Sequence, residues 1–307
     1  MAQHHIRLAS GAGPTFGVDD IACAAASHLG LWEKEGLIVD WTPALGGVKA
    51  MTKILDGEVD AAYGGLGPVL QLRAQGQPLR IIASMARALA QNLVVQPHIK
   101  TTDDLKGASW AVDGIGALSH HMARSIVSQL SLNDDDITWR VTGPPPERIA
   151  ELLSGAADVS LIRVEEALAL TGDPSNNLKM LLGFVQLKAL VPVQPHGVLA
   201  TTESYEQAEP EKLQMLAQGI ISASRLLAVD FDAFLKTFEH YVSVKLAPAQ
   251  IEQIWQQECQ SRGFAVDGEM STAHWNAQMG AFAGLNPSLR PVEVSEILAT
   301  QFVKNVI

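Results

Sequence analysis

Residues 55–68, LDGEVDAAYGGLGP, contain the pattern on which the predicted fold depends. Gly57 ends a helix that begins at Gly46-Gly47, and the apolar strand Val59–Tyr63 follows directly. A glycine-rich loop, Gly64–Pro68, then leads into the next helix. Buried strands that are continuous apolar runs between helices are typical of a parallel sheet covered by helices, so the sequence predicts an α/β fold.

The same alternation of strand and helix extends from this stretch in both directions. The predicted elements are the strand Ile6–Ala9, a helix over Asp19–Lys34, the strand Leu37–Trp41, a helix through Ile54, the strand Val59–Tyr63, a helix to Ala74 and the strand Leu79–Ala83. Apolar residues recur at helical spacing in the first of these helices. Gly36 follows it, as glycine often follows a helix C-terminus.

A second series of elements repeats the first. Leu153-Ser154-Gly155-Ala156-Ala157-Asp158 occupies the same place in its series as Leu55-Asp56-Gly57-Glu58-Val59-Asp60, since each ends a helix with glycine and opens a strand with aspartate. The second series comprises the predicted strand Ala108–Val112, a helix from Leu118 to about Ser131, the strand Ile137–Val141, a helix from Pro144 through Leu153 and the strand Asp158–Ile162. Internal duplication of one α/β unit explains this best.

The chain changes character after Leu190. Gly197–Thr201 is one more predicted strand, which we expect to rejoin the first lobe, and from Pro210 onward the sequence is mostly helical. Beyond the helix at Pro210, the predicted helices are Phe231–Tyr241, Ala249–Arg262, Thr272–Phe282 and Val292–Val303.

Length and composition limit the class of protein. The chain has 307 residues, and one hydrophobic core seldom serves a chain of this size, so we expect two lobes or domains. The formal net charge is −11 and we find no basic stripe, which argues against nucleic acid as a partner. Two cysteines, Cys23 and Cys259, are too few for a disulfide framework or a paired-cysteine metal site.

Signals for membrane insertion and export are not apparent in the sequence as written. No stretch approaches the ~18 consecutive apolar residues of a transmembrane helix, so a membrane-spanning protein is not expected. Met1–Arg7 is not a basic region followed by an apolar core. The sequence as written therefore predicts a cytoplasmic protein, or a periplasmic one if a signal segment has been removed.

Glycine or proline occupies nearly every loop that leads from a predicted strand into a helix. These loops are Gly11–Pro14, Gly46-Gly47, Gly64–Pro68, Asp113–Ala117 and Pro144–Pro146. Open parallel sheets bind ligands at such strand ends, where glycine admits close approach and the amides of helix N-termini attract negative charge. One such loop is more often an ordinary turn, but five at equivalent places in two repeats favour a cleft for a small, anionic molecule.

We expect no cofactor, metal or catalytic group. The loop Gly11–Pro14 lacks the third glycine of a dinucleotide fingerprint, and no Walker-type motif is present. His120 and His121 are adjacent, and neighbouring helical residues point about 100° apart, so at most one can face a cleft. We find no metal-ligand spacing. Cys23 lies among alanines in a predicted helix, and we interpret it as buried packing.

Residues 28–37, HLGLWEKEGL, resemble the xxGLFEKEGL signature of the periplasmic-binding-protein-like family. Within that family the chain is most similar to the substrate-binding proteins for nitrate, sulfonates, taurine and thiamine precursors. Asp56–Asp60, Gly76–Leu79 and Thr102–Gly107 resemble further motifs of these proteins in order and spacing. The resemblance extends from Ile6 to about Leu170 and is specific for the fold rather than for the ligand.

The resemblance implies a two-lobed, type 2 binding-protein fold with a helical C-terminal region. Residues 1–90 and 191–307 would form lobe 1, residues 91–190 would form lobe 2, and the lobes would close on a ligand by hinge motion. By position, the resemblance places in the ligand-facing loops Ser10, Gly11, Gly47, Gly65, Leu66, Ser119, His120 and Pro145.

Arg163 stands where many relatives have a Trp-Glu-Pro-like segment. Its guanidinium is suited to bind a carboxylate or sulfonate bidentately, which makes Arg163 a candidate ligand-binding residue. A salt bridge to Glu165, Glu166 or another acid would explain the residue equally well. Both interpretations are open from the sequence.

Three functions are compatible with this resemblance. The first is a substrate-binding protein that delivers a small, anionic organic solute to the permease of an ABC transporter. The second is a cytoplasmic enzyme on the same fold, such as a decarboxylase or desulfinase, and the third is a ligand sensor. We favour the first on the resemblance, because a catalytic nucleophile and a helix-turn-helix segment are not apparent.

Overall fold

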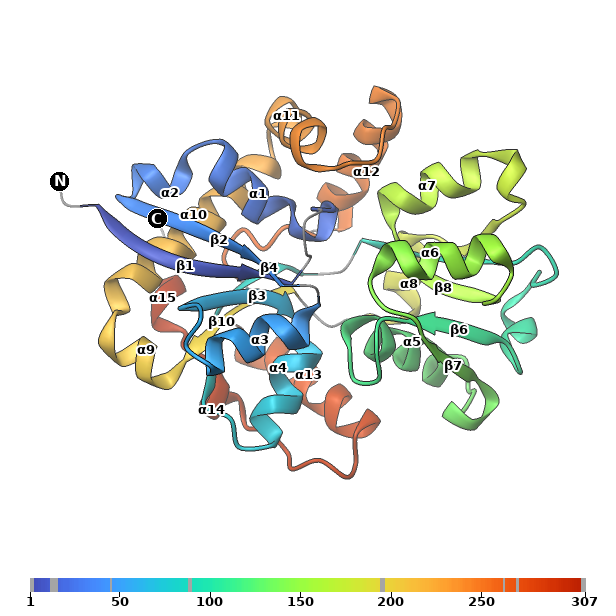
Figure 1. Ribbon diagram of the computed structural model, residues 1–307, viewed down its shortest axis with the longest axis horizontal. Helices are drawn as coiled ribbons and strands as arrows, with labels where there is room; N and C mark the ends of the chain where they lie inside the picture. The colour runs from blue at the N-terminus through green and yellow to red at the C-terminus, as the bar shows by residue number, and fades with distance from the viewer. Residues whose placement is uncertain are drawn as a thin grey trace.

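The computed structural model describes residues 3–11, 16–44, 46–87, 90–193, 197–261, 263–268 and 271–304. Within them the chain forms two lobes side by side, each built on a five-stranded sheet (Figure 1). The two-lobed α/β fold with a helical C-terminal region, expected from the sequence, is confirmed. We keep the predicted ranges, 1–90 with 191–307 and 91–190, as our assignment of lobes 1 and 2.

The lobe 1 sheet combines N-terminal strands with one strand from much later in the chain. Its order is β2 (Leu37–Pro43), β1 (His4–Ser10), β3 (Ala61–Gly65), β10 (Gly197–Thr202) and β4 (Leu79–Ala86). β1 is parallel to β2 and β3, whereas β10 is antiparallel to β3 and β4. The strand predicted at Gly197–Thr201 therefore does rejoin the N-terminal strands.

The lobe 2 sheet follows the same plan. Its order is β7 (Thr138–Val141), β6 (Ser109–Val112), β8 (Val159–Arg163), β5 (Gln91–Val95) and β9 (Lys179–Leu182). β6 is parallel to β7 and β8, and β5 is antiparallel to β8 and β9. Each sheet thus has three parallel strands followed by an antiparallel one, as internal duplication predicts. β5 and β9 are not among the predicted strands.

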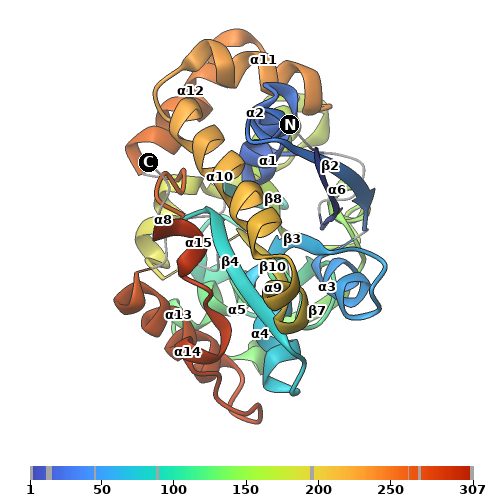
Figure 2. The same cartoon turned by 90° about the vertical axis from the view of Figure 1, so that its left-hand side faces the viewer.

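Helices pack against both sheets (Figures 1 and 2). The α-helices of the described residues are α1 (Ile21–His28), α2 (Leu31–Lys34), α3 (Gly47–Leu55), α4 (Leu66–Ala74), α5 (Leu118–Gln129), α6 (Pro145–Ser154), α7 (Val164–Gly172), α8 (Phe184–Leu190), α9 (Glu203–Ala208), α10 (Pro210–Leu227), α11 (Phe231–Tyr241), α12 (Pro248–Ser261), α13 (Thr272–Leu285), α14 (Val294–Ile297) and α15 (Gln301–Lys304). Short 3₁₀ helices are η1 (Val18–Asp20), η2 (Thr102–Leu105), η3 (Asp134–Asp136) and η4 (Pro174–Asn176). None of these helices has the length and hydropathy needed to cross a bilayer.

Two predicted helices are wrong as continuous elements. The helix predicted over Asp19–Lys34 is divided into η1, α1 and α2, because Gly30 adopts a left-handed conformation with φ +62° between the last two. The helix predicted over Val292–Val303 is divided into α14 and α15. Between them Leu298 pairs with Ile81 of β4, and this long-range contact outweighs the local helical pattern.

The core of lobe 1 has a part on each face of its sheet. Helices α1, α10 and α11 cover one face, and α3, α4 and α13 cover the other. Figure 2 shows α10 lying across β4 and the neighbouring strands. Trp32 is 1% exposed, and its indole N–H donates a hydrogen bond to the backbone oxygen of Leu216 on α10 at 3.1 Å. Gly219 admits the indole ring, because a Cβ at that position would lie 2.2 Å from Trp32 Cδ1.

The two lobes also touch through glycines. A Cβ at each of three glycines in lobe 1 would lie within 2.7 Å of a lobe 2 side chain, closer than real Cβ atoms come. The pairs are Gly17 with Arg163, Gly65 with Leu118 and Gly67 with His121. At these three places the lobes are in direct contact.

We predict opposite effects for two glycine-to-alanine substitutions in helices. Gly219→Ala is expected to lower the free energy of unfolding by about 1–3 kcal/mol, because its methyl group overpacks the core against Trp32. Gly280→Ala in α13, where a Cβ would meet nothing within 4 Å, is expected to raise it by up to about 1 kcal/mol through helix propensity. Urea unfolding followed by circular dichroism measures both. If Gly219→Ala left the free energy of unfolding unchanged, the packing of Gly219 against Trp32 would be contradicted.

Candidate functional site

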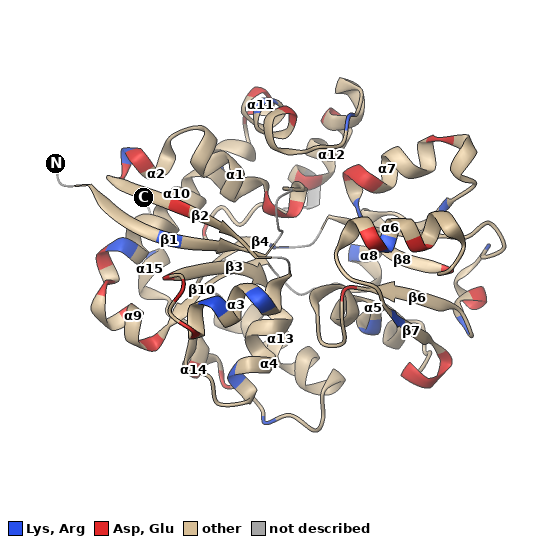
Figure 3. Cartoon of the chain, viewed as in Figure 1, with Lys and Arg blue, Asp and Glu red and all other residues tan. Residues whose placement is uncertain are grey.

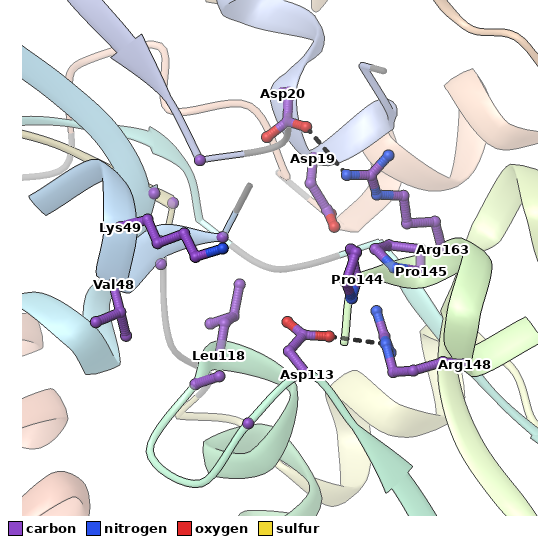
Figure 4. A pocket seen from close by; sticks show the side chains of 18 of the residues that line it. Asp19, Asp20, Val48, Lys49, Asp113, Leu118, Pro144, Pro145, Arg148 and Arg163 are labelled. Atoms are coloured by element: carbon purple, nitrogen blue, oxygen red, sulfur yellow. Dashed lines mark ion pairs between the residues drawn. The ribbon is translucent and has the colours of Figure 1, made fainter. Parts of the chain in front are cut away.

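A cavity of about 520 Å³ lies between the lobes at the carboxyl ends of the parallel strands (Figure 4). This volume is typical of a small-molecule site. Its lining residues in lobe 1 are Gly11, Asp19, Asp20, Gly46, Gly47, Val48, Lys49, Tyr63, Gly64, Gly65 and Gly197. Those in lobe 2 are Gln91, Asp113, Gly114, Ile115, Ala117, Leu118, Pro144, Pro145, Pro146, Glu147, Arg148 and Arg163.

Three helices direct their N-termini toward this cavity. The residues that precede α3, α4 and α5 are Gly46, Gly65 and Ala117, and none of them caps its helix with a side chain. The amides of a first helical turn have no partner within the helix, and the helix dipole places partial positive charge there. Lobe 1 and the start of α5 therefore offer backbone donors to an anionic group.

The start of α6 has a different chemistry from that expected. Pro145 and Pro146 have no N–H, and the next amides, of Glu147 and Arg148, donate to the oxygen of Pro144. The loop Pro144–Pro146 therefore cannot supply the amide donors that the sequence pattern suggested. It forms an apolar wall instead, which faces Leu118 across the cavity in Figure 4.

The structure brings five of the nine candidate binding residues named from the sequence to the cavity wall. They are Gly11, Gly47, Gly65, Pro145 and Arg163. Gly11 and Gly64 serve lobe 1 itself, because a Cβ on Gly11 would lie 2.8 Å from Tyr63 O and one on Gly64 would lie 3.3 Å from Gly47 Cα. Their close approach is to neighbouring backbone, and this brings the loops of the cavity floor together.

The other four suggested residues are not among the residues that line the cavity. Leu66 packs in the core of lobe 1. The Ser10 hydroxyl bonds to Tyr63 Oη at 3.2 Å, and Ser119 Oγ accepts from the amide of Asp113 at 2.9 Å. His120 Nδ1 accepts from the amide of Gly116 at 3.0 Å. Each of these three polar groups thus has a partner in the protein, and a binding role for them stays a prediction.

Arg163 lines the cavity, but acids of the protein surround it. It is 7% exposed, and its guanidinium lies 3.6 Å from the Asp20 carboxylate of lobe 1. Burial acts to lower its pKa, but the carboxylates of Asp20, Glu165, Glu166 and Asp19 outweigh burial and raise the pKa above its usual value. Arg163 is therefore always protonated and already compensated. This favours the salt-bridge interpretation, with Asp20 as the partner.

The acids around Arg163 have pKa values above their usual values, because they are buried. Burial raises the pKa of Asp20 to about 6, although Arg163 opposes the rise. Burial likewise raises the pKa of Glu165 to about 8, and the pKa values of Asp19 and Glu166 also rise. Figure 3 shows acidic residues at the start of α7, where Glu165 and Glu166 lie in the first turn.

Lys49 is the lining cation that is left without an acidic partner among the described residues. Arg148, the third lining cation, is paired with Asp113 at 2.7 Å. Lys49 lies in the first turn of α3 and extends toward the middle of the cavity in Figure 4. The sequence analysis missed it. The feature of the sequence that could have identified Lys49 is its position just after Gly46-Gly47, in a loop that was already predicted to face the cleft.

The histidines and Cys23 do not add catalytic or metal-binding groups to the cavity wall. Burial lowers the pKa of both His120 and His121 to about 4, so both rings are neutral at pH 7. Within the described ranges, no cluster of His, Cys, Asp and Glu is suited to hold a metal ion. Cys23 is fully buried, its thiol contacts Met85 Sδ at 3.1 Å, and burial raises its pKa well above the usual value.

A family model described as NMT1/THI5 like matches residues 19–228. The chain belongs to this family. A comparison with curated proteins finds no match. Among solved structures, a protein from Bordetella bronchiseptica RB50 is similar over 99% of this chain and 97% of its own, with 21% identity and a TM-score of 0.79.

Two further similar structures have named ligands. The alkanesulfonate-binding protein SsuA from Xanthomonas axonopodis pv. citri, bound to MOPS, has a TM-score of 0.78 and 19% identity over 98% of this chain and 99% of that chain. The periplasmic nitrate-binding protein NrtA from Synechocystis PCC 6803 has a TM-score of 0.75 and 12% identity over 99% of this chain and 88% of that chain. At these identities the likeness concerns the fold.

We predict that Glu165→Gln stabilises the protein at alkaline pH. Glu165 has a folded pKa raised from 4.5 to about 8, so the fold favours its protonated form. Its contribution to stability is present below pH 4.5 and is lost as the pH rises through 8. At pH 9, the variant is expected to exceed the wild type by on the order of 1–3 kcal/mol, and at pH 4 to match it.

Calorimetry across this pH range measures the difference, with Glu151→Gln as the control. Glu151 is paired with Arg140 near the surface at 2.7 Å, and its substitution should cost little and show no such pH dependence. A Glu165→Gln variant that is less stable than the wild type at pH 9 would show that the ionised pair with Arg163 holds the fold.

Proposed function

We propose that this protein is the substrate-binding component of an ABC-type importer. In this role it would hold a small organic solute with an anionic group in the cavity between its lobes and deliver it to a permease. The observation that carries the proposal is the convergence of Lys49 with the uncapped N-termini of α3, α4 and α5 on one cavity between the lobes.

The fold and the family support this assignment. SsuA and NrtA, with which the chain shares its fold over nearly its whole length, are named as alkanesulfonate- and nitrate-binding proteins. NrtA is described as periplasmic, and a periplasmic location is part of the proposal for this chain. A role in binding a solute and delivering it to a permease would explain why the chain forms two lobes with a cavity between them.

The shape of the cavity supports an organic solute rather than a bare inorganic anion. Val48, Leu118 and the prolines at Pro144–Pro145 contribute apolar surface on several sides. A cavity of about 520 Å³ is also much larger than an ion of a few atoms requires. We therefore propose that an apolar body lies between Leu118 and the proline wall, while the anionic group reaches Lys49 and the helix N-termini.

The residues at the crossing between the lobes support closure by hinge motion. Asp19 of lobe 1 accepts from the amide of Ala90 at 2.5 Å and from the side-chain amide of Gln91 at 3.0 Å, where the chain enters lobe 2. The lobes are also in contact through the glycine pairs described above. A solute that contacts both walls would stabilise this closed arrangement.

Lys49→Ala is expected to weaken binding of the anionic solute about tenfold to a hundredfold, because a charge-assisted hydrogen bond contributes about 1.5–3 kcal/mol. Titration calorimetry with a panel of alkanesulfonates, carboxylates and nitrate measures the change. Lys53→Ala is the matched control, since Lys53 is on the same helix but is paired with Glu58 outside the cavity. Unchanged affinity in Lys49→Ala would remove Lys49 from the site.

Gly67→Ala is expected to impair closure. The added methyl group would lie 2.3 Å from His121 Cδ2, so the closed arrangement becomes less populated and the apparent affinity falls by the same factor. Small-angle X-ray scattering with and without solute measures closure. Gly172→Ala is the control, because a Cβ there meets nothing within 4 Å. Equal compaction by solute in both variants would contradict a role for the Gly67–His121 contact.

A further inference from the structure

We propose that the junction of α4, α5 and α13 is an acid-sensitive contact: it holds the lobes together while the His121 ring is neutral, and protonation of that ring separates them. α4 and α13 of lobe 1 lie against α5 of lobe 2 at this junction (Figure 1). The described residues that line the cavity of about 520 Å³ do not include His121. The inference thus goes beyond the proposed function, since it needs hinge motion but no bound solute.

His121 lies where the two lobes touch. It is on α5 and is 4% exposed. A Cβ on Gly67 would lie 2.3 Å from His121 Cδ2 and 2.9 Å from its Nε2, so this edge of the ring packs against the first turn of α4. The ring of Phe282 on α13 lies next to the imidazole, with the two centroids 5.2 Å apart. Both neighbours belong to lobe 1.

A second, small cavity of about 30 Å³ borders His121. Its wall comes mostly from lobe 1, and the lining residues include Leu66 and Leu70 of α4 and Phe282 of α13. From lobe 2, the described residues in this wall are His121 and Ser125 of α5. Lobe 1 therefore provides much of the burial of His121, and separation of the lobes would bring its ring into contact with water.

The surroundings of His121 favour a neutral ring. Neither ring nitrogen has a hydrogen-bond partner among the described residues. Burial lowers the pKa of His121 to about 4, and the neighbouring His120 and Arg124 act in the same direction. The first turn of α4, against which the ring packs, adds the partial positive charge of a helix N-terminus. A proton on His121 therefore weakens the contact between the lobes.

Acidic side chains of the elements around His121 do not stabilise its protonated form. The other titratable or charged residues of α4, α5, α8, α13 and η3 are Arg73, His120, Arg124, Lys188, His274, Asp134, Asp135 and Asp136. None of these three aspartates is among the groups that shift the pKa of His121. Asp134, which does act on His120, is paired with Arg124 at 2.7 Å.

Acid therefore favours separated lobes. A His121 ring in water has the usual pKa of 6.5, whereas the ring at the junction has a pKa of about 4, so the separated form binds the proton more tightly. The contact has its full strength above pH 6.5, weakens as the pH falls through 6.5 and stops changing below pH 4. At pH 5, these two pKa values shift the equilibrium toward separation by about thirtyfold.

The acids beside Arg163 respond to pH in the opposite sense. Burial raises the pKa of Asp20 to about 6 and that of Glu165 to about 8, so protonation favours their burial between the lobes. The response of the wild type is the sum of both effects. A test of His121 must therefore compare proteins that share these acids and differ at one histidine.

His121→Gln and His120→Gln are the matched variants for this test. Both histidines are buried on α5 with a pKa of about 4, but His120 packs within lobe 2, where its ring centroid lies 4.9 Å from that of Trp139. Small-angle X-ray scattering of the whole protein without added solute, at pH 7.5 and pH 5, gives the ratio of separated to contacting molecules. On acidification this ratio is expected to rise about thirtyfold more in the wild type and in His120→Gln than in His121→Gln. Circular dichroism at pH 5 distinguishes separation from unfolding.

A His121→Gln variant that responds to pH as the wild type does would overturn the inference, and so would a His120→Gln variant that loses the response. If His121→Gln does not fold, an NMR titration of the His121 ring in the wild type decides the question. Protonation of the ring and separation of the lobes must then occur over one pH range, and protonation without separation would overturn the inference. Because the experiment uses no solute, its failure would leave the proposed binding role standing.

Discussion

The contact between η1 of lobe 1 and the start of α7 of lobe 2 is the constraint on which the rest of this structure depends. Asp20 reaches Arg163 at 3.6 Å across the lobes, and its neighbour Asp19 holds the chain crossing at Ala90 and Gln91. Asp19, Asp20 and Arg163 also line the cavity. The contact between the lobes and the charge of the cavity wall therefore involve the same side chains.

Glycine has two structural roles here that differ from close approach to a ligand. Within lobe 1, Gly11 and Gly64 let the loops of the cavity floor touch one another. Between the lobes, Gly65 leaves room for the side chain of Leu118, and Gly67 leaves room for that of His121. A cleft rich in glycine is thus explained largely by the packing of loops and lobes. The polar chemistry of the cavity comes from few side chains and from the first-turn amides that those glycines leave uncapped.

The sequence determines the local pattern of this fold more clearly than its long-range contacts. Apolar runs bounded by glycine correctly predicted the strands around Val59–Tyr63 and the repeat, because both signals lie within a few residues. The break in the helix at Val292–Val303 could not be predicted in this way, since it depends on pairing of Leu298 with Ile81. The pairing of Asp20 with Arg163 is equally invisible in sequence, and Lys49 differs from other lysines only by its position after two glycines.

The duplicated unit has diverged at equivalent helix starts, and this divergence polarises the cavity. In lobe 1, α3 begins Gly47-Val48-Lys49, whereas its equivalent α6 begins with two prolines and Glu147. Likewise α4 begins after Gly65, whereas its equivalent α7 begins after Arg163 and carries Glu165 and Glu166 in its first turn. One repeat thus supplies amide donors and the ammonium group of Lys49, and the other supplies apolar surface and buried acids. Because burial raises the pKa values of Glu165 and Glu166, the second repeat contributes carboxyls whose ionisation the fold disfavours.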